Sequence, residues 1–500
     1  EKNTVSLQGL EPGDLVEFEY ITLRPPNRVK EGSYITSQVF LFQDIEKPFH
    51  RTEWTVEYPP GLAMEFLEKN LPGRGEKGQS GPNAFSRWAF RDMPRIPPEP
   101  DTPNKLLFVP MVEAAGAIAW RDVALFMRES ILGTYQVTPE IERRFRRATA
   151  GLGAKEEVLE ALLKSCLQDV DGDDDGSWQD PTQTLLTRQG GRLPLLCAYL
   201  ALAGIPFDVL LAEPVPDRVS RESLPRLGQF RVPVVKVGLP SGAKYLTLSG
   251  PRRDPWILPW FLQGAEAFPV TARDPWKVET VPADFGPWER AYERETRVIR
   301  PDGDFHVTYR AELDPDASEG MRSALARVPK DQWRRAIQMA VSHRYGSVDL
   351  EDYQLENLET PEGPVIWTYT AVIHGGAIKD GNRLTAADPL PAFHLGQALG
   401  SLKERKLPLA TGGPIFLRQE VVFRVPEGAE AGFPPGDREV RSPFGEYVLK
   451  VSREKTEIGI LRRLAVPSQV IWPNRYAEFQ TFLKAVDDAE SGQLSVTLPP

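Results

Sequence analysis

Alternating apolar and polar side chains dominate the first part of the chain. The segments 16–20 (VEFEY) and 54–58 (WTVEY) change between the two kinds at every residue, and in 87–91 (RWAFR) two aromatic residues alternate with arginine and alanine. Because successive side chains of a strand point to opposite faces of a sheet, this period of two predicts half-buried strands. Proline, glycine and asparagine at 25–27 and 81–83 supply turns. We therefore predict an N-terminal antiparallel β-sandwich domain over residues 1–110.

The pattern changes to helical spacing after Met111. Residues 120–130 predict one helix, and a second begins at 138–140, where a capping threonine precedes a proline and an acid. In a third, 154–168, the apolar residues fall on one face. A helix that ends at Gly204, a buried strand at 207–211 and a hairpin over 230–248 are predicted to follow. Helices followed by antiparallel strands predict an α+β domain over residues 111–275.

Strand patterns return from about residue 276 onward. They are expected at 297–300, 305–309, 365–373, 415–425, 447–451 and 458–464. One helical stretch, 320–343, is inserted, and 474–489 predicts a terminal helix before a last strand at 494–498. The third predicted domain is therefore β-rich and covers residues 276–500, which makes the whole chain a multidomain α+β protein.

Composition narrows the classes of function. The formal net charge is −10 and the isoelectric point lies near 5.4, which argues against a nucleic-acid binder, because such proteins carry a concentrated basic surface. The segment 193–212 is apolar and about long enough to span a membrane. Gly204, Pro206 and Asp208 divide it into a helix and a strand, so we expect no membrane span in this segment.

The ends and the metal-binding residue types give little further information. The chain begins at Glu1 without an apolar leader, so we expect a mature or trimmed form, with a removed signal peptide or an upstream domain left open. Two cysteines, Cys166 and Cys197, exclude a disulfide-rich scaffold and a cysteine-based metal site. The five histidines are scattered without the spacing of zinc ligands. We expect no cofactor, apart from the calcium discussed below.

Several short motifs occur in a characteristic order along the chain. They are residues 13–20 (GDLVEFEY), 51–56 (RTEWTV), 120–123 (WRDV) and 444–447 (FGEY), with an aromatic-rich segment at 473–482. This order resembles a bacterial family in which a β-domain of unknown function precedes a transglutaminase-like core and a second β-domain follows it. The resemblance spans nearly the whole chain. It implies a papain- or transglutaminase-like central domain and, because members of that family commonly carry export signals, an exported protein of the periplasm or cell envelope.

Such a core catalyses acyl transfer with a cysteine at the start of its central helix, a histidine base and an aspartate that orients the base. The resemblance places the nucleophile at Gln189, or at the latest at Arg192. It places the base at Val232 and the orienting acid at Thr247 or Ser249. Glutamine cannot form a nucleophile, and arginine never loses its proton at neutral pH. All three roles are vacant, so the resemblance implies a pseudoenzyme.

Cys197 offers an alternative nucleophile. It lies about two turns into the central helix, in register with Leu193 and Leu200. There the helix dipole no longer stabilises a thiolate, and apolar burial raises the pKa of a thiol. The rival hypothesis is a thiol-dependent acyltransferase or peptidase that uses Cys197.

The position at which the resemblance places the nucleophile lies in a glycine-rich basic turn. Arg188, Gln189 and Arg192 surround two glycines just before a helix, a geometry that favours anions such as carboxylate or phosphate. These three residues are the candidate ligand-binding residues. In the alternative interpretation the glycines only form the turn and the arginines pair with preceding acids.

The preceding acids resemble part of a calcium loop. Asp171, Asp173 and Asp175 occupy its first, third and fifth positions, and Gly176 follows at the sixth. Thr182 stands where the bidentate glutamate is required, so the match is incomplete. The alternatives are a solvated acidic loop and a weak calcium site, and a calcium site would imply a calcium-stabilised surface or adhesion module.

The motifs together predict a non-catalytic protein with a transglutaminase-like core. We expect it to act as a binding or scaffolding module of the bacterial cell envelope. Its partner would be a protein or a cell-envelope component.

Overall fold

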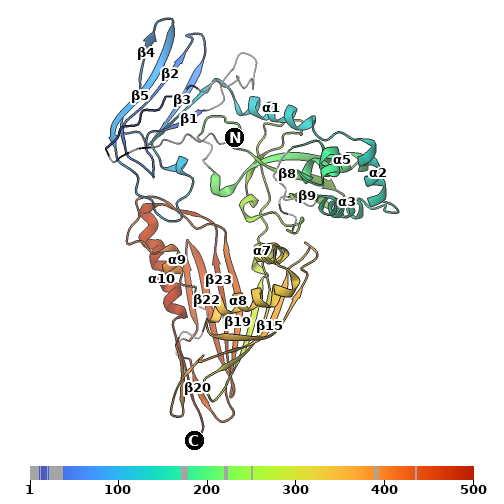
Figure 1. Cartoon of the computed structure of the whole chain (residues 1–500), viewed down its shortest axis with the longest axis vertical. Coiled ribbons are helices and arrows are strands. Elements are labelled where there is room, and N and C mark those ends of the chain that lie inside the picture. Colours follow the sequence, from blue (N-terminus) through green and yellow to red (C-terminus); the bar gives the residue numbers. More distant parts are fainter. Residues whose placement is uncertain are drawn as a thin grey trace.

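A computed structural model describes residues 9, 11, 13–19, 21, 38–170, 178–218, 223–248, 250, 252–387, 390, 393–433 and 436–500. The molecule is a mixed α+β, β-rich, multidomain protein with three parts (Figure 1). The N-terminal strands and the helical central part lie at one end of the long axis. The C-terminal strands extend to the other end, where the chain terminates.

The N-terminal part consists of two three-stranded antiparallel sheets that share one core, the sandwich that the alternation predicts. One sheet has the order β1-β6-β3 and the other β2-β5-β4. Aromatic side chains from both sheets fill the space between them, and the rings of Trp54 and Trp88 stack with centroids 5.8 Å apart. The strands are β1 (Gln38–Leu41), β2 (Phe49–Tyr58), β3 (Met64–Lys69), β4 (Glu76–Ser80), β5 (Asn83–Met93) and β6 (Met111–Gly116).

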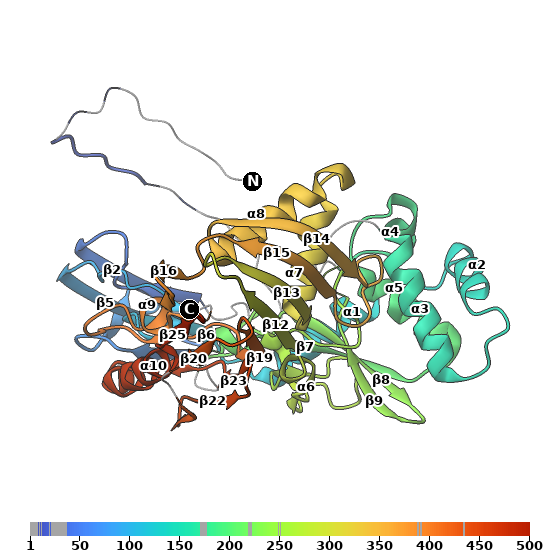
Figure 2. The ribbon, with the colours of Figure 1, turned by 90° about the horizontal axis from the view of Figure 1, so that it is seen from below.

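Two details of this part differ from the prediction. The alternating residues 13–19 form no strand, the side chain of Leu15 is 95% exposed, and Figure 2 draws this segment apart from the sheets. Alternation indicates which face each side chain would take, but a strand also needs a neighbour to bond with. In addition, β6 is the central strand of its sheet, so the sandwich continues beyond residue 110 to Gly116.

The central part packs helices on one face of a five-stranded antiparallel sheet of order β11-β10-β7-β8-β9. The predicted helix that ends at Gly204 is α5, and a short helix, α4, precedes the turn in which Arg188 and Gly190 adopt positive φ. The elements are α1 (Trp120–Leu132), α2 (Pro139–Ala148), α3 (Lys155–Asp169), α4 (Pro181–Thr187), α5 (Arg192–Ala203), β7 (Phe207–Glu213), β8 (Val232–Leu239), β9 (Gly242–Leu246), β10 (Glu266–Phe268) and β11 (Glu279–Thr280).

The largest sheet, in the C-terminal part, has eight strands in the order β14-β15-β13-β12-β19-β23-β22-β21, in which only β12 and β19 pair in parallel. Smaller sheets have the orders β16-β17-β25-β20 and β18-β24. The strands are β12 (Tyr292–Ile299), β13 (Phe305–Glu312), β14 (Val348–Glu356), β15 (Ile366–Ile373), β16 (Ile378–Asp380), β17 (Arg383–Ala387), β18 (Leu409–Ala410), β19 (Ile415–Arg424), β20 (Glu430–Gly432), β21 (Arg438–Ser442), β22 (Gly445–Arg453), β23 (Glu457–Val466), β24 (Val470–Ile471) and β25 (Gln493–Thr497).

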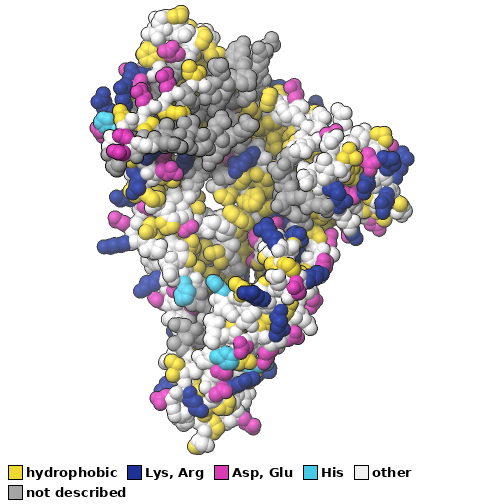
Figure 3. Space-filling model, in the orientation of Figure 1, with side chains coloured by type: hydrophobic (Ala, Val, Ile, Leu, Met, Phe, Trp, Pro, Cys, Tyr) yellow, Lys and Arg dark blue, Asp and Glu magenta, His cyan; other side chains and the backbone are white. Residues whose placement is uncertain are grey.

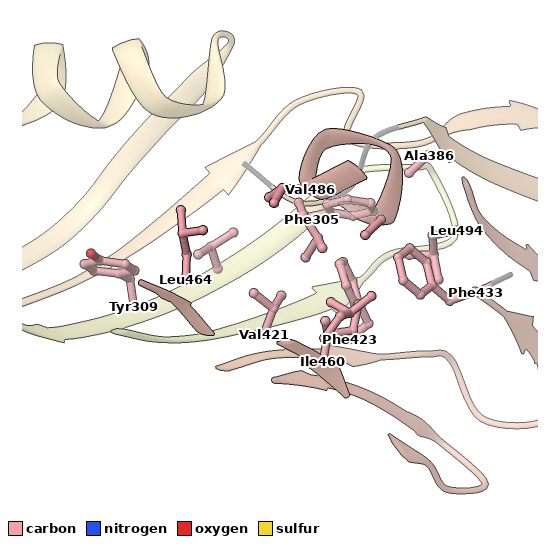
Figure 4. Close-up of a cluster of buried hydrophobic side chains, with 14 of the residues drawn as sticks. Phe305, Tyr309, Ala386, Val421, Phe423, Phe433, Ile460, Leu464, Val486 and Leu494 are labelled. Atoms are coloured by element: carbon pink, nitrogen blue, oxygen red, sulfur yellow. The ribbon is translucent and has the colours of Figure 1, made fainter. Parts of the chain in front are cut away.

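Helices cover this sheet and complete its core. The predicted stretch 320–343 is two helices, α7 (Pro315–Ala326) and α8 (Trp333–Tyr345), because Pro329 interrupts it. Figure 2 shows α8 beside β14 and β15. The predicted terminal helix is α10 (Tyr476–Glu490), with α9 (Leu395–Leu399) beside it. Figure 4 shows the apolar side chains that strands and α10 bury together, among them Phe305, Val421, Ile460 and Val486.

Charged side chains join the three parts. The Glu99 carboxylate contacts Arg405 at 3.3 Å and accepts hydrogen bonds from two backbone N–H groups of the C-terminal part. Arg253 of the central part contacts Asp316 and Glu319 of α7 at 2.5 and 2.6 Å. Among the described residues, no helix combines the length and the apolar character needed to cross a membrane.

Candidate functional site

The start of α5 and the end of β7 lie at the same end of the central part. Only Gly204, Ile205 and Pro206 separate α5 from β7, and α5 packs on the sheet that contains β7. Gly204 has φ +59 and closes the helix in the left-handed conformation. The strand therefore runs back along the helix. This end of the sheet is where the resemblance to transglutaminase-like proteins expects the active site.

The predicted anion-binding turn is bound to the end of α3. Arg188 donates from Nη2 to the carbonyl of Gln168 at 3.0 Å, and Arg192 donates from Nη2 to the carbonyl of Val170 at 2.8 Å. Arg192 is 0% exposed, whereas Gln189 is exposed. Helix C-terminal carbonyls need donors, and these guanidinium groups supply them. The buried Arg192 is thus a structural residue in this conformation, closed to a ligand from solvent.

The residue at the expected base position does not face the central helix α5. The side chain of Val232 packs with Leu210 and Ala212, on the face of the sheet opposite to α5. The helix covers the face that carries Val235 and Val237. Successive side chains of a strand point to opposite faces, so a side chain one position further along would point to the helix, whereas Val232 points away from it.

Thr247 is buried and lies between Leu246 and Leu248, which both pack in the cluster around α5. Ser249 lies outside the described residues.

The thiol of Cys197 is enclosed by the core of the central part. The residue is 0% exposed, and Cys166 of α3 packs in the same cluster. Burial, with a smaller contribution from Cys166, raises the pKa of the Cys197 thiol far above its ordinary value. A catalytic thiol would need a histidine as its base. Three histidines contact carboxylates of the flanking parts, namely His50, His306 and His374. The environment of Cys197 thus favours the neutral thiol, which is the weaker nucleophile.

The candidate calcium residues Asp171, Asp173 and Asp175 lie outside the described residues. Within the part of the chain that is described, no group of three or more His, Cys, Asp or Glu side chains could hold a metal ion. The calcium loop therefore stays a prediction.

A pocket of about 440 Å³ opens at the end of the sheet where α5 begins. Three aromatic rings form its wall: Phe230 and Phe268 lie with centroids 4.4 Å apart, and Trp120, the first residue of α1, packs on both. The polar lining residues are Glu213, Gln229, Glu266 and Thr280. No pattern in the sequence indicated this pocket.

Two carboxylates face each other in this pocket. Glu213 of β7 and Glu266 of β10 are directly paired across the antiparallel ladder, so their side chains project from the same face. Glu213 is 2% exposed and accepts a hydrogen bond of 3.1 Å from Gln229 Nε2, while Ser223 Oγ donates to Gln229 Oε1 at 2.9 Å. Both carboxylates also take part in interactions within the protein. Like charges directly opposite each other in a ladder are destabilising unless a positive group lies close to them.

Comparison with known proteins finds a sequence match for a segment of the C-terminal part and a similar fold for most of the chain. Residues 389–496 match the sequence profile of a domain of unknown function with a solved structure, DUF3858. A crystal structure from Parabacteroides distasonis ATCC 8503, described as a "putative protease", resembles the chain with a TM-score of 0.54 and 13% sequence identity. The similarity covers 92% of this chain and 75% of that chain. At this identity it concerns the fold alone. No curated protein matches the chain significantly.

Proposed function

We propose that this protein is a non-catalytic binding module with a transglutaminase-like central fold, and that its ligand is a positively charged group. A lysine or arginine side chain of a partner protein fits the pocket at the start of α5. The order of helices and antiparallel strands, the order of sequence motifs and the fold shared with a structure described as a protease support this fold assignment.

The pocket that combines aromatic walls with Glu213 and Glu266 carries the proposal. A cation over an aromatic face gains about 0.5–2 kcal/mol, depending on how far it is desolvated. An ionised carboxylate can accept about four hydrogen bonds, so a bound cation would share Glu213 and Glu266 with their partners inside the protein. The exposed Thr280 adds a polar contact at the rim. A neutral ligand would gain the apolar contacts but not the electrostatic ones.

The absence of a reactive cysteine at this end supports the non-catalytic part of the proposal. Among the described residues that line the pocket there is no cysteine or histidine. A thiol-dependent acyltransferase would have to use Cys197, which is buried. We expect iodoacetamide to label Cys197 at a small fraction of the rate measured in urea. Rapid labelling of the native protein, together with a peptidase activity that Cys197→Ser removes, would instead establish the enzyme.

We also propose that the protein acts in the periplasm or cell envelope, on a protein or envelope component. This part follows from the sequence resemblance. Cell fractionation of the source organism tests it, and a purely cytoplasmic location would contradict it.

Titration with small model ligands tests the pocket. We expect N-acetyl-arginine amide and N-acetyl-lysine amide to bind in the millimolar range by calorimetry, and the neutral N-acetyl-glutamine amide to bind more weakly. Glu266→Gln keeps the shape of the side chain but removes its charge, so it should weaken cation binding about three- to tenfold. The control is Glu129→Gln, an exposed change on α1. Equal affinity for charged and neutral ligands, or an unchanged Glu266→Gln variant, would refute the proposal.

A further inference from the structure

A cavity of about 290 Å³ lies between α2 and α3 of the central part. Its lining residues come from the second half of each helix. Ala148 of α2 and Ala161 of α3 leave the space open, because an alanine side chain ends at Cβ. Figure 3 shows several Lys and Arg side chains at the right-hand end of the molecule, where Figure 1 places these two helices. The cavity shares no lining residue with the pocket beside the start of α5.

Three cations and one carboxylate line this cavity. The cations are Arg144, Arg147 and Lys164, and the carboxylate is Asp169. Asp169 already has partners, because Arg144 Nη1 donates to its Oδ1 and Ser165 Oγ donates to its Oδ2, both at 2.9 Å. The lining therefore keeps an excess of positive charge.

The two acids of α2 are paired with arginines. Glu140 contacts Arg143 and Arg144, and Glu142 contacts Arg146. None of the glutamates of α3 lines the cavity. Within the described part of the chain, no second carboxylate therefore belongs to the lining.

Two of the three cations have no partner of their own. Arg147 and Lys164 are exposed, and neither makes a side-chain hydrogen bond or ion pair with any described residue. Arg144 donates from Nε to Glu140 and from Nη1 to Asp169, so the N–H groups of its Nη2 remain for a ligand. Guanidinium and ammonium groups are donors only, so the ligand that satisfies them is a negatively charged acceptor.

A phosphate group matches this arrangement better than a carboxylate does. It carries about −1.5 to −2 charges at pH 7 and has three terminal oxygens, whereas a carboxylate carries a single charge on two oxygens. Arginine binds phosphate through two parallel hydrogen bonds, and lysine binds it as a point charge. A phosphate can thus neutralise the excess charge and offer one oxygen to each cation of the lining.

We propose that the cavity between α2 and α3 binds a phosphate group. Arg147 and Lys164 are its main contacts, and Arg144, held in place by Asp169, is the third. Soluble phosphorylated compounds and phospholipid head groups share this chemistry. The site lies at the surface, so the affinity falls as the salt concentration rises.

Calorimetric titration of the whole protein with inorganic phosphate tests the proposal, with acetate as the reference anion. The titration is done at neutral pH in about 0.1 M sodium chloride, where exposed charges more than about 10 Å apart are largely screened. We expect phosphate to bind in the millimolar range and about tenfold more tightly than acetate.

Two pairs of substitutions locate the binding. Arg147→Gln with Lys164→Gln removes both unpaired cations and should weaken phosphate binding at least about tenfold. The matched control is Arg143→Gln with Arg146→Gln, which removes the same charge from exposed positions of α2 that do not line the cavity. The control should change the affinity less than about twofold.

Vesicles identify the source of the phosphate. Sedimentation with phosphatidylcholine vesicles that contain phosphatidic acid, lost in the Arg147→Gln with Lys164→Gln variant, would assign the cavity to a lipid head group. Binding of inorganic phosphate without binding to these vesicles would assign it to a soluble phosphorylated compound.

Three results would overturn the proposal. They are the absence of phosphate binding at millimolar concentration, an equal loss of affinity in the test and control variants, and equal affinity for phosphate and acetate. Tighter phosphate binding after Asp173→Asn with Asp174→Asn would also contradict it, because the cations would then belong to the acidic segment that follows α3 in the sequence. Glu266→Gln, which tests the pocket beside α5, should leave phosphate binding unchanged.

Discussion

Arg462 of β23 is the centre of a buried polar network in the C-terminal sheet, and its removal gives the sharpest test of the structure. The side chain is 2% exposed. Its Nε donates to Gln419 Oε1 at 2.7 Å and its Nη1 to Glu490 Oε1 at 2.6 Å, while the guanidinium lies 4.6 Å from the ring centroid of Phe393. Tyr447 also donates to Glu490 Oε1 at 3.0 Å. This network connects β22 and β23 with α10.

The substitution Arg462→Met keeps most of the apolar stem and removes the charge. Glu490, which is 4% exposed, then loses its only ion-pair partner among the described residues. Breaking a buried ion pair on one side costs about 3–5 kcal/mol, because the remaining charge is uncompensated. Removing both charges is less costly, so Arg462→Met with Glu490→Gln should recover at least about 2 kcal/mol relative to the sum of the single changes.

The loss of stability caused by Arg462→Met should also depend on pH. Burial raises the pKa of Glu490, and Arg462 opposes that rise. Without Arg462 the pKa of Glu490 lies higher still in the folded protein. The folded variant then binds more protons than the unfolded chain between the ordinary pKa and this raised value. Its stability relative to the parent protein therefore increases as the pH falls from 7 toward about 4.5, the usual range of glutamate.

Hydrogen exchange of the peptides that cover β23 and α10 measures this effect in the C-terminal part alone, since a three-part chain need not unfold in one step. The free energy of opening is compared for the parent, both single variants and the double variant at pH 7 and pH 5. Additive free-energy changes, or a cost of Arg462→Met that is the same at both pH values, would refute the argument.

Two further predictions concern turns of the C-terminal sheet. Gly303 has φ +99, and a Cβ at this position would lie 2.4 Å from the carbonyl oxygen of Ala377. Gly303→Ala should therefore destabilise the protein by about 1–3 kcal/mol, measured as a lower urea midpoint of unfolding. An unchanged midpoint would show that the turn adapts. Hydrogen bonds with Asp349 and Asp304 raise the pKa of His374, so its contribution to stability is present below the ordinary histidine pKa and is lost as the pH rises through the raised value. His374→Gln should remove this dependence from the melting temperature between pH 6 and 9, and a dependence that persists would assign it to other groups.

The new pocket could not be found from the sequence, although its acids are visible there. Glu213 ends an apolar strand, and Glu266 begins a short one, positions where an acid more often faces solvent. Their residue numbers differ by 53, and only the pairing of β7 with β10 places them opposite each other. Trp120 enters the same pocket from α1. No local pattern encodes such an arrangement.

The local pattern of apolar residues was sufficient to predict a helix or strand where one face of the element is continuously apolar. The terminal helix was expected at 474–489 and is found at 476–490, because Phe479, Leu483 and Val486 lie on one helical face. Strand β14 was missed, since four of its nine residues are charged and it lies at the edge of its sheet. Residues 13–19 show the opposite error, with alternation but no neighbouring strand.

The sequence by itself therefore determined the order of β-rich, helical and β-rich parts and the main helices. It also indicated that Cys197 belongs to a core, because its helix is apolar on all sides. Only the tertiary structure decided that Arg192 binds the end of α3, that Val232 faces away from α5, and that two carboxylates meet beside aromatic rings. Secondary structure follows from neighbours along the chain, whereas a site depends on strand pairing and packing between residues far apart in sequence.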